Sequence, residues 1–311
     1  MRAIVVRSFG GPEVLETLEI DVPEPGPGQV RVQIDASSLN PIDVSTRRGN
    51  LAEAGLMTRS AVVGLGWDVA GRIDAAGPDV AGFSIGDRVV GLRDLLFVVP
   101  GAHAEQVVLD ATAVAKAPST TSGVEAATLP LNGLTADGAL SACGLRPGET
   151  LLVTGAAGGV GGFVVELAAL HGIRTIAVAG HSDETLVREL GATEFVHRSE
   201  DLGMAARKVA PGGVHAVIDA AVVGIGAHNA LRAGGTFVAL VRPFAPPPIR
   251  NTHVIVHETY ADGARLEELS ALVDARRLTL RVAETYPLTE ARRAHDRFAR
   301  GGLRGRLVLV P

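Results

Sequence analysis

The sequence has one cysteine, few aromatic residues and no excess of positive charge. The single cysteine, Cys143, cannot form a disulfide within the chain, and no Cys-Cys spacing exists to hold a structural zinc ion. A net charge of −5 gives no basic footprint for nucleic acid. No apolar run approaches the ~20 residues of a membrane span, and the first residues lack a signal-peptide pattern. The expectation is a cytoplasmic protein without nucleic-acid or membrane partners.

The residues that are abundant indicate a globular, aliphatic protein. Of 311 residues, 47% are hydrophobic, 20% are charged and 38 are glycine. This length is enough for two domains with separate cores, and the glycine content predicts many tight turns.

The first region, residues 1–119, predicts a β-rich domain. Short runs such as Val30–Ile34 and Arg88–Val90 are bounded by glycine and proline, as in strands with irregular connections. The region from 257 to 311 is too short to be a separate domain. We expect its strands to rejoin residues 1–119; its predicted elements are a helix over 262–275, a strand over 279–282, a helix from about 289 and a strand over 306–310.

The middle region, residues 120–256, predicts a separate α/β domain. Pro130 divides the Ala- and Leu-rich segment before it from the one after it, which favours two short helices. Strands that are apolar on both faces are typical of a parallel sheet covered by helices on both sides, so the fold class is α/β with a doubly wound, Rossmann-type sheet. The strands are expected at 151–154, 173–178, 195–196, 214–218 and 236–240, with helices over 158–171 and from Ser182, as N-cap, to Gly191.

A glycine-rich turn follows the first of these strands and opens a helix. Unpaired N–H groups and a partial positive charge at a helix N-terminus suit a pyrophosphate, and glycine allows the backbone to approach it closely. The literal G-x-G-x-x-G is absent, because alanine stands at its first position. The turn predicts dinucleotide binding by Gly155, Ala156, Ala157, Gly158, Gly159, Val160 and Gly161.

The end of the second strand indicates which dinucleotide is bound. NAD-binding domains place an acid there for the ribose 2′-hydroxyl, but this chain has Gly180, His181 and Ser182. An uncharged site leaves room for a 2′-phosphate, with donors from His181, Ser182 and Arg198, although Arg198 is as well explained as a solvated surface charge. The sequence therefore favours NADPH over NADH.

Motifs along nearly the whole chain carry a family resemblance. The sequence resembles the medium-chain dehydrogenase/reductase superfamily, and within it the zinc-independent quinone oxidoreductase branch that includes the zeta-crystallin-like enzymes. The motifs are Asn40-Pro41-Ile42-Asp43, Gly66-Trp67-Asp68-Val69-Ala70-Gly71, Gly86-Asp87-Arg88-Val89, Gly101-Ala102-His103-Ala104-Glu105, Ala127-Thr128-Leu129-Pro130-Leu131, Gly133-Leu134-Thr135-Ala136, the Gly155 turn and Arg304-Gly305-Arg306-Leu307-Val308-Leu309.

The resemblance implies a GroES-like catalytic domain beside the Rossmann-type domain, an active site in the cleft of a bilobal subunit, and a homodimer. It implies roles near the nicotinamide for Thr135 and at the cofactor for Arg304. Zinc alcohol dehydrogenases of this superfamily place a cysteine at the Asn40–Asp43 segment and Gly-His-Glu at Gly66-Trp67-Asp68. The resemblance therefore implies an enzyme without zinc. A tyrosine common in the branch is absent after Asp43, and His103 stands where a tyrosine is common, which leaves the substrate open.

Candidate catalytic residues follow from the chemistry of hydride transfer. Negative charge develops on the oxygen of a reduced quinone or enone, and a hydrogen-bond donor stabilises it. Asn40 can donate without ionising, although an Asx turn explains Asn-Pro equally well. Asp43 and Asp68 are weaker candidates, with helix capping as the alternative for Asp43, and Thr135 is a further catalytic candidate through the family resemblance. His103 is open to a structural role, and we expect Cys143 to serve only in packing.

The segment 92–100 is unusually apolar for a connection. Its Phe97, together with Trp67 and Phe244, is a candidate lining for a hydrophobic acceptor pocket, and a core strand explains the segment equally well. The favoured function is an NADPH-dependent, zinc-independent reductase of quinones or of the activated C=C bonds of enones and enals. The alternatives are an enoyl-thioester reductase of a biosynthetic pathway and an NADPH-binding redox sensor without useful turnover.

Overall fold

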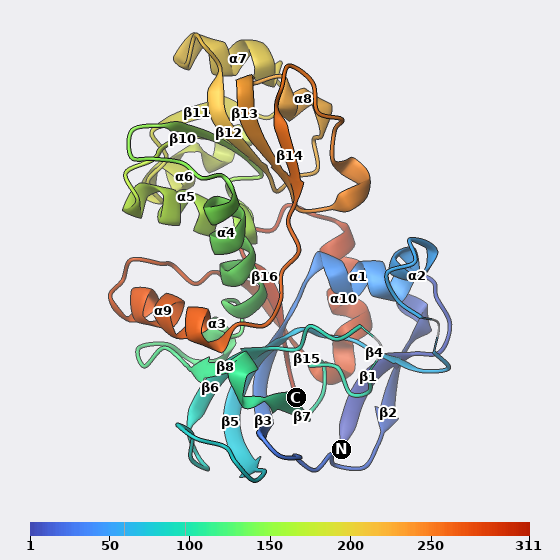
Figure 1. Cartoon of the computed structure of the whole chain (residues 1–311). Helices are drawn as coiled ribbons and strands as arrows, with labels where there is room; N and C mark the ends of the chain where they lie inside the picture. Colours follow the sequence, from blue (N-terminus) through green and yellow to red (C-terminus); the bar gives the residue numbers. More distant parts are fainter. Residues whose placement is uncertain (59, 97) are drawn as a thin grey trace. The chain divides into compact units, whose positions relative to one another are not determined.

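The protein forms two compact units, seen in a computed structural model that describes residues 1–58, 60–96 and 98–311. Unit 1 comprises Met1–Leu134 and Tyr260–Pro311, and unit 2 comprises Thr135–Thr259 (Figure 1). The expected domain over 120–256 begins earlier than unit 2, because the helix α3 (Gly123–Ala126) contacts strands of unit 1. None of the helices in the described ranges is long and apolar enough to cross a bilayer.

Unit 1 is built mainly of antiparallel strands around an aliphatic core. Three strands pair in the order β2-β1-β4. Seven strands form a second sheet: six follow the order β15-β16-β3-β5-β6-β8, and β7 pairs with β3 outside this order. Its core includes Val32, Ile73 and Val107, from β3, β5 and β7. The strands are β1 (Arg2–Val6), β2 (Leu15–Glu19), β3 (Gln29–Leu39), β4 (Val63–Gly64), β5 (Asp68–Ala76), β6 (Arg88–Leu92), β7 (Gln106–Asp110), β8 (Val114–Lys116), β15 (Val282–Pro287) and β16 (Arg306–Val310).

One helix of unit 1, α10 (Ala291–Ala299), packs over the core of β1 and β16. Leu288, Ala291 and Ala294 pack in one buried cluster with Leu307 and Leu309 of β16. The return of β16 to pair with β3 brings the chain end into unit 1. The remaining helices are α1 (Pro41–Arg48), α2 (Asn50–Glu53) and α9 (Gly263–Asp274), with short 3₁₀ turns over Pro12–Val14, Ala111–Ala113 and Leu288–Glu290.

Unit 2 contains a six-stranded parallel sheet in the order β11-β10-β9-β12-β13-β14. This order reverses direction at β9, as in a Rossmann-type fold. The helices α7 and α8 cover one core cluster, while α5 contacts β9 and β10. The elements are β9 (Thr150–Thr154), α5 (Gly159–Leu170), β10 (Arg174–Ala179), α6 (Glu184–Glu189), β11 (Glu194–His197), α7 (Leu202–Val209), β12 (Val214–Asp219), α8 (Ile225–His228), β13 (Leu231–Ala239) and β14 (His253–Val256).

The helix α4 (Pro130–Ala142) joins the two units in the sequence. Pro130 begins it, so the expected division into two short helices, α3 and α4, is confirmed. Proline suits a first helical position because its missing N–H would have no partner there.

Three expectations about individual elements were wrong. The strand expected at 279–282 starts only at Val282, because its partner β16 starts at Arg306, which lies opposite Val282. Ser182 is not the N-cap of α6: the Asp183 amide bonds the Gly180 carbonyl in a 3₁₀ turn, so Asp183 precedes the helix. The edge strand β14 was missed, since its four residues, flanked by Asn251 and Thr252, carry little periodic signal.

Candidate functional site

The glycine turn in unit 2 joins β9 to α5 at the carboxyl edge of the parallel sheet. Gly155 has φ of +62°, which glycine adopts without strain, and Gly158 precedes the first helical residue, Gly159. The first amides of α5 have no acceptor within the helix. A Cβ on Gly161 would stand 2.2 Å from the Gly155 carbonyl oxygen. Glycine at 161 therefore lets the start of α5 lie close against the backbone of Gly155 and Ala156.

The turn is braced by Asp219, which we did not predict from the sequence. Its Oδ1 accepts hydrogen bonds from the Thr154 hydroxyl at 2.5 Å and the Val223 amide at 3.0 Å, and its Oδ2 accepts one from the Gly224 amide at 2.7 Å. Asp219 ends β12 directly beside Thr154, the last residue of β9. The only signal in the sequence was an acid at the end of an apolar strand.

A second group of polar residues gathers where β10 and β11 end. The rings of His181 and His197 stack with centroids 3.9 Å apart and planes at 10°. Ser182 and Arg198 are exposed beside them, and the Arg198 amide bonds to the Ala179 carbonyl. Asp183 is buried, with its Oδ2 beside Gly180. The structure thus brings together the residues expected to bind a 2′-phosphate, and adds His197.

Thr135 lies in the part of α4 that belongs to unit 2 and is 9% exposed. Its hydroxyl is 2.8 Å from the hydroxyl of Thr259, and either of the two can donate. Thr259 ends the segment that follows β14, so this pair ties α4 to the end of unit 2.

In unit 1, Asn40 and Asp68 form a buried pair, both with 0% exposure. The Asn40 amide nitrogen donates to Asp68 Oδ2 at 2.6 Å and lies 3.3 Å from the Ser38 carbonyl oxygen. A carboxylate can only accept hydrogen bonds, so the side chain of Asn40 must turn its NH2 group, and not its oxygen, toward Asp68. Asn40 Oδ1 has no hydrogen-bond partner among the described residues. The atom that Asn40 can offer is an acceptor, and not the donor expected from the sequence.

Asp68 collects three donors, which the sequence did not reveal. The Ser38 hydroxyl and the Asn40 amide donate to Oδ2, and the Leu131 amide donates to Oδ1 at 2.6 Å. Burial raises the pKa of Asp68 to about 6, although these hydrogen bonds and Arg306 oppose the shift. Burial likewise lowers the pKa of Arg306 to about 10, against the attraction of Asp68. Arg306 donates to the side-chain oxygen of Asn132.

Asp43 serves the backbone on two sides. Its Oδ2 accepts the Asn40 amide at 2.8 Å, at the start of α1, and its Oδ1 accepts the Gly66 amide at 2.9 Å. Burial raises the pKa of Asp43, and His103 opposes this. Helix capping therefore accounts for one of the two contacts of Asp43. The other holds α1 to Gly66, two residues before β5 starts.

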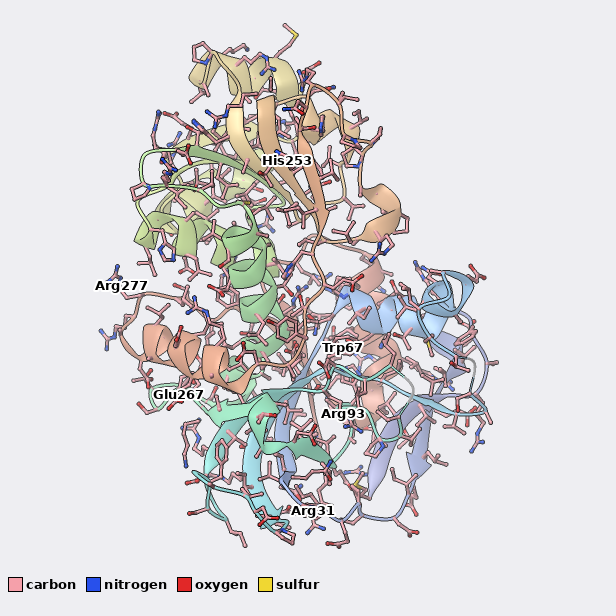
Figure 2. All side chains as sticks on the ribbon, viewed as in Figure 1. Arg31, Trp67, Arg93, His253, Glu267 and Arg277 are labelled. Atoms are coloured by element: carbon pink, nitrogen blue, oxygen red, sulfur yellow. The ribbon has the colours of Figure 1, made fainter. Side chains whose placement is uncertain are left out.

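The other predicted residues belong to both units. Trp67, labelled in Figure 2, is half-buried in unit 1. Phe244, 53% exposed, belongs to unit 2, and Phe97 lies outside the described residues. Arg304 is exposed in unit 1, where its guanidinium lies 3.4 Å from the Gly302 carbonyl oxygen.

Two further residues have structural surroundings. His103 is buried, with Nε2 3.2 Å from the Ser38 carbonyl oxygen. Cys143 is buried, its thiol donates to the Ala139 carbonyl, and burial raises its pKa to about 12, as expected of a packing residue. Within the described ranges, no three His, Cys, Asp or Glu side chains are arranged to hold a metal ion.

The fold defines the class: a Rossmann-type unit with a glycine turn beside a GroES-like unit is the architecture of the medium-chain dehydrogenases/reductases. Residues 26–119 match the family described as "Alcohol dehydrogenase GroES-like domain", and residues 190–309 match the one described as "Zinc-binding dehydrogenase". A quinone oxidoreductase of Pseudomonas aeruginosa is 30% identical over 332 residues, covering 100% of this chain and 99% of that protein. The chain belongs to the quinone oxidoreductase family of this superfamily of oxidoreductases.

Solved structures agree with this assignment. A structure titled as an NAD-dependent alcohol dehydrogenase superposes with a TM-score of 0.89 at 31% identity, over 100% of both chains. A mycobacterial protein solved in complex with NADPH superposes with a TM-score of 0.86 at 29% identity, again over 100% of both chains. The two titles name different nicotinamide cofactors.

Proposed function

We propose that this protein is an NADPH-dependent oxidoreductase that reduces quinones, or the activated C=C bonds of enones and enals, by hydride transfer without zinc. The observation that carries the proposal is the glycine turn, whose backbone cradle suits a pyrophosphate, with a stacked imidazole pair at the ends of β10 and β11, where Asp183 is buried. The quinone substrate is argued from the names of the relatives, and the enone from the similar charge that develops on its oxygen.

This chain's own residues favour NADPH, whereas the similar solved structures are named for different nicotinamide cofactors. His181, Ser182, His197 and Arg198 supply donors at the ends of β10 and β11, and the carboxylate of Asp183 is buried. A 2′-phosphate gains hydrogen bonds from such donors, whereas a 2′-hydroxyl lacks the carboxylate that it prefers.

When bound, NADPH supplies the hydride, and the protein binds and orients the cofactor and the acceptor. Residues 155–161 would hold the pyrophosphate, and Thr135 and Arg304 would contact the cofactor. Asn40 Oδ1, which has no partner among the described residues, would accept a hydrogen bond from a donor group of the ligand. Asp43 and Asp68 act as positioning residues, since they hold the backbone and the amide of Asn40. The proton that completes the reduction comes from water.

We also propose that the reaction proceeds without zinc. The zinc enzymes of the superfamily have a cysteine in the segment that corresponds to Asn40–Asp43, and a histidine where this chain has Trp67. An amide nitrogen and an indole are not zinc ligands, and the side chain of Asn40 is already engaged with Asp68. Trp67 and Phe244 remain the candidates for the apolar wall of the acceptor site.

The test follows oxidation of NADPH and of NADH with a panel of quinones, enones, enals and enoyl thioesters. We expect turnover with quinones or enones and a lower Kd for NADPH than for NADH. Activity restricted to thioesters would replace the substrate class, and equal affinity for both cofactors would overturn the preference. Tight NADPH binding without turnover of any acceptor would favour a redox sensor. Activity that is undiminished by a chelator, in protein that metal analysis finds free of zinc, would support the zinc-free proposal.

We also propose a cytoplasmic homodimer. The strand β14 ends the order of the parallel sheet, and its residues are half-buried or exposed. An edge strand presents unpaired backbone groups that a second copy can pair with. Light scattering coupled to gel filtration tests this: a mass near 32.0 kDa would contradict it.

A further inference from the structure

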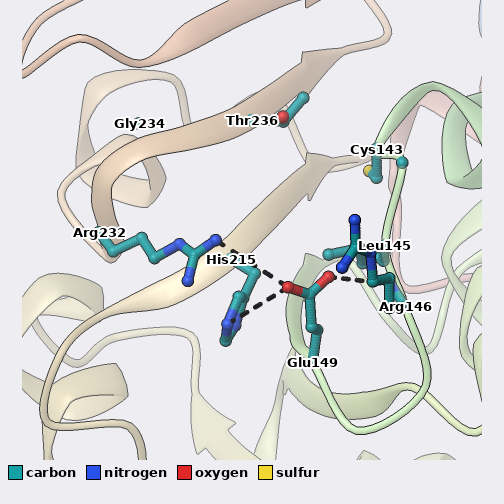
Figure 3. Close-up of a pocket in the computed structure, with 9 residues that line it drawn as sticks. Cys143, Leu145, Arg146, Glu149, His215, Arg232, Gly234 and Thr236 are labelled. Atoms are coloured by element: carbon teal, nitrogen blue, oxygen red, sulfur yellow. Dashed lines mark hydrogen bonds and ion pairs between the residues drawn. The ribbon is translucent and has the colours of Figure 1, made fainter.

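A second polar site lies within unit 2, at the amino edge of the parallel sheet. It is a pocket of about 370 Å³ (Figure 3). The strand β9 starts there, at Thr150, and reaches the glycine turn after five residues, about 17 Å away. The pocket is therefore separate from the cofactor turn. Its lining residues are Cys143, Gly144, Leu145, Arg146, Glu149, His215, Arg232, Gly234 and Thr236.

The charges of the pocket favour an anion. Arg146 and Arg232 contribute two guanidinium groups against the single carboxylate of Glu149. Figure 3 shows Arg232 and Arg146 on opposite sides of that carboxylate. With His215 neutral the formal charge is positive, whereas the whole protein carries −5. A local positive site in an acidic protein is not a consequence of general composition.

Glu149 does not satisfy the donors around it. Its Oε2 accepts the Arg146 backbone amide at 2.8 Å. Its Oε1, however, lies 4.0 Å from an Arg232 nitrogen and 3.7 Å from His215 Nε2, too far for direct hydrogen bonds. Both guanidinium groups are on exposed residues and are free to turn toward a ligand.

His215 is held in one tautomer that suits the same ligand. The Thr150 amide donates to its Nδ1 at 3.1 Å, so Nδ1 is unprotonated and Nε2 carries the hydrogen. Burial and Arg232 lower the pKa of His215, against Glu149, which agrees with a neutral ring. His215 therefore presents an N–H donor beside the two guanidinium groups.

We propose that this pocket binds the phosphate group of a small anionic molecule. Arg146, Arg232 and His215 approach from different segments, so their donors suit the several acceptor oxygens of a tetrahedral dianion better than the two of a planar carboxylate. The proposal does not depend on the oxidoreductase function.

The experiment titrates the full-length protein with inorganic phosphate by calorimetry, at constant ionic strength in chloride. For the site that depends on Arg146 and Arg232 we expect a Kd on the order of 1 mM and at least fivefold weaker binding of acetate and citrate. Arg232→Ala and Arg146→Ala should each weaken phosphate about tenfold. Glu149→Gln should tighten it severalfold, because it removes the opposing charge. The matched control is Arg174→Ala, an exposed arginine at the start of β10 that does not line the pocket.

In Gly161→Val, which alters the cofactor turn, phosphate binding should be unchanged. No phosphate binding, equal binding of carboxylates, or binding that survives both arginine substitutions would overturn the proposal. A loss of phosphate binding in Gly161→Val would assign it to the cofactor turn instead.

Discussion

The two units build their candidate sites from different kinds of atoms, backbone atoms in unit 2 and side-chain atoms in unit 1. In unit 2 the turn of residues 155–161 is a cradle of backbone atoms, in which a Cβ at Gly161 would strike the Gly155 carbonyl. In unit 1 the corresponding feature is a buried group of side chains, in which Asp68 collects the hydrogen bonds of Ser38, Asn40 and Leu131. Backbone sites are sensitive to added volume, and side-chain networks are sensitive to a lost partner.

Loss of the Asp68 carboxylate should have the largest effect on stability. Asp68→Leu leaves three buried donors without an acceptor and Arg306 without its opposite charge, so we expect a loss of about 3–5 kcal/mol in the free energy of unfolding. Urea unfolding measures it. The control is Asp21→Leu, an exposed acid of the same unit, which should stay within about 0.5 kcal/mol. Equal losses in the two variants would contradict the network.

The same carboxyl should give a pH dependence of defined sign. The pKa of Asp68 rises from 3.8 to about 6 on folding, so between these values the folded protein holds a proton that the unfolded chain has released. Its contribution to the free energy of unfolding is fully present below about pH 4 and is lost as the pH rises through 6, by at most ~3 kcal/mol. Other carboxyls titrate too, so the quantity measured is the difference between the wild type and Asp68→Asn. A difference with no slope over this range is the contrary result.

Added volume should break the backbone site of unit 2. Gly161→Val places side-chain atoms against the Gly155 carbonyl, and we expect NADPH binding to weaken about 10- to 100-fold. Gly212→Ala, at a glycine of the same unit whose Cβ would meet nothing within 4 Å, is the control. Cofactor fluorescence gives Kd, and circular dichroism checks folding. An unchanged Kd would show that the turn does not hold the cofactor.

A strained residue beside the turn predicts a smaller change in the opposite direction. Val222 has φ of +59°, a conformation that a β-branched residue rarely adopts, in the loop held by Asp219. Val222→Gly relieves this strain but costs backbone entropy, so the net gain is about 1 kcal/mol or less. Thermal unfolding should show a higher Tm, whereas Val223→Gly, without positive φ, should lower it.

The smallest expected effect concerns cofactor choice. His197→Gln removes the ring that stacks on His181, and we expect NADPH affinity to fall about two- to fivefold while NADH affinity is unchanged. His171→Gln, an exposed histidine at the end of α5, is the control. Parallel losses for both cofactors would place His197 outside the 2′-phosphate site.

Much of the fold could be predicted because its signals are local. Apolar runs and the glycines between them indicated β9, α5, β10 and β12, and Pro130 indicated the start of α4. The errors arose where pairing with a neighbouring strand decides whether a segment forms a strand. The pairing of β15 with β16 starts at Val282, where Arg306 lies opposite, and β14 is a strand because β13 lies beside it.

The sequence by itself determined the fold class and the family, since both depend on local periodicity and on ordered motifs. It also located the turn of residues 155–161. Only the tertiary structure decided that Asn40 gives its side-chain nitrogen to Asp68, 28 residues away, and keeps a buried oxygen without a partner among the described residues. The contact of Arg306 with Asn132 and the stack of His181 on His197 likewise join distant segments. Such contacts depend on which strands and loops meet in space, and no local pattern records that.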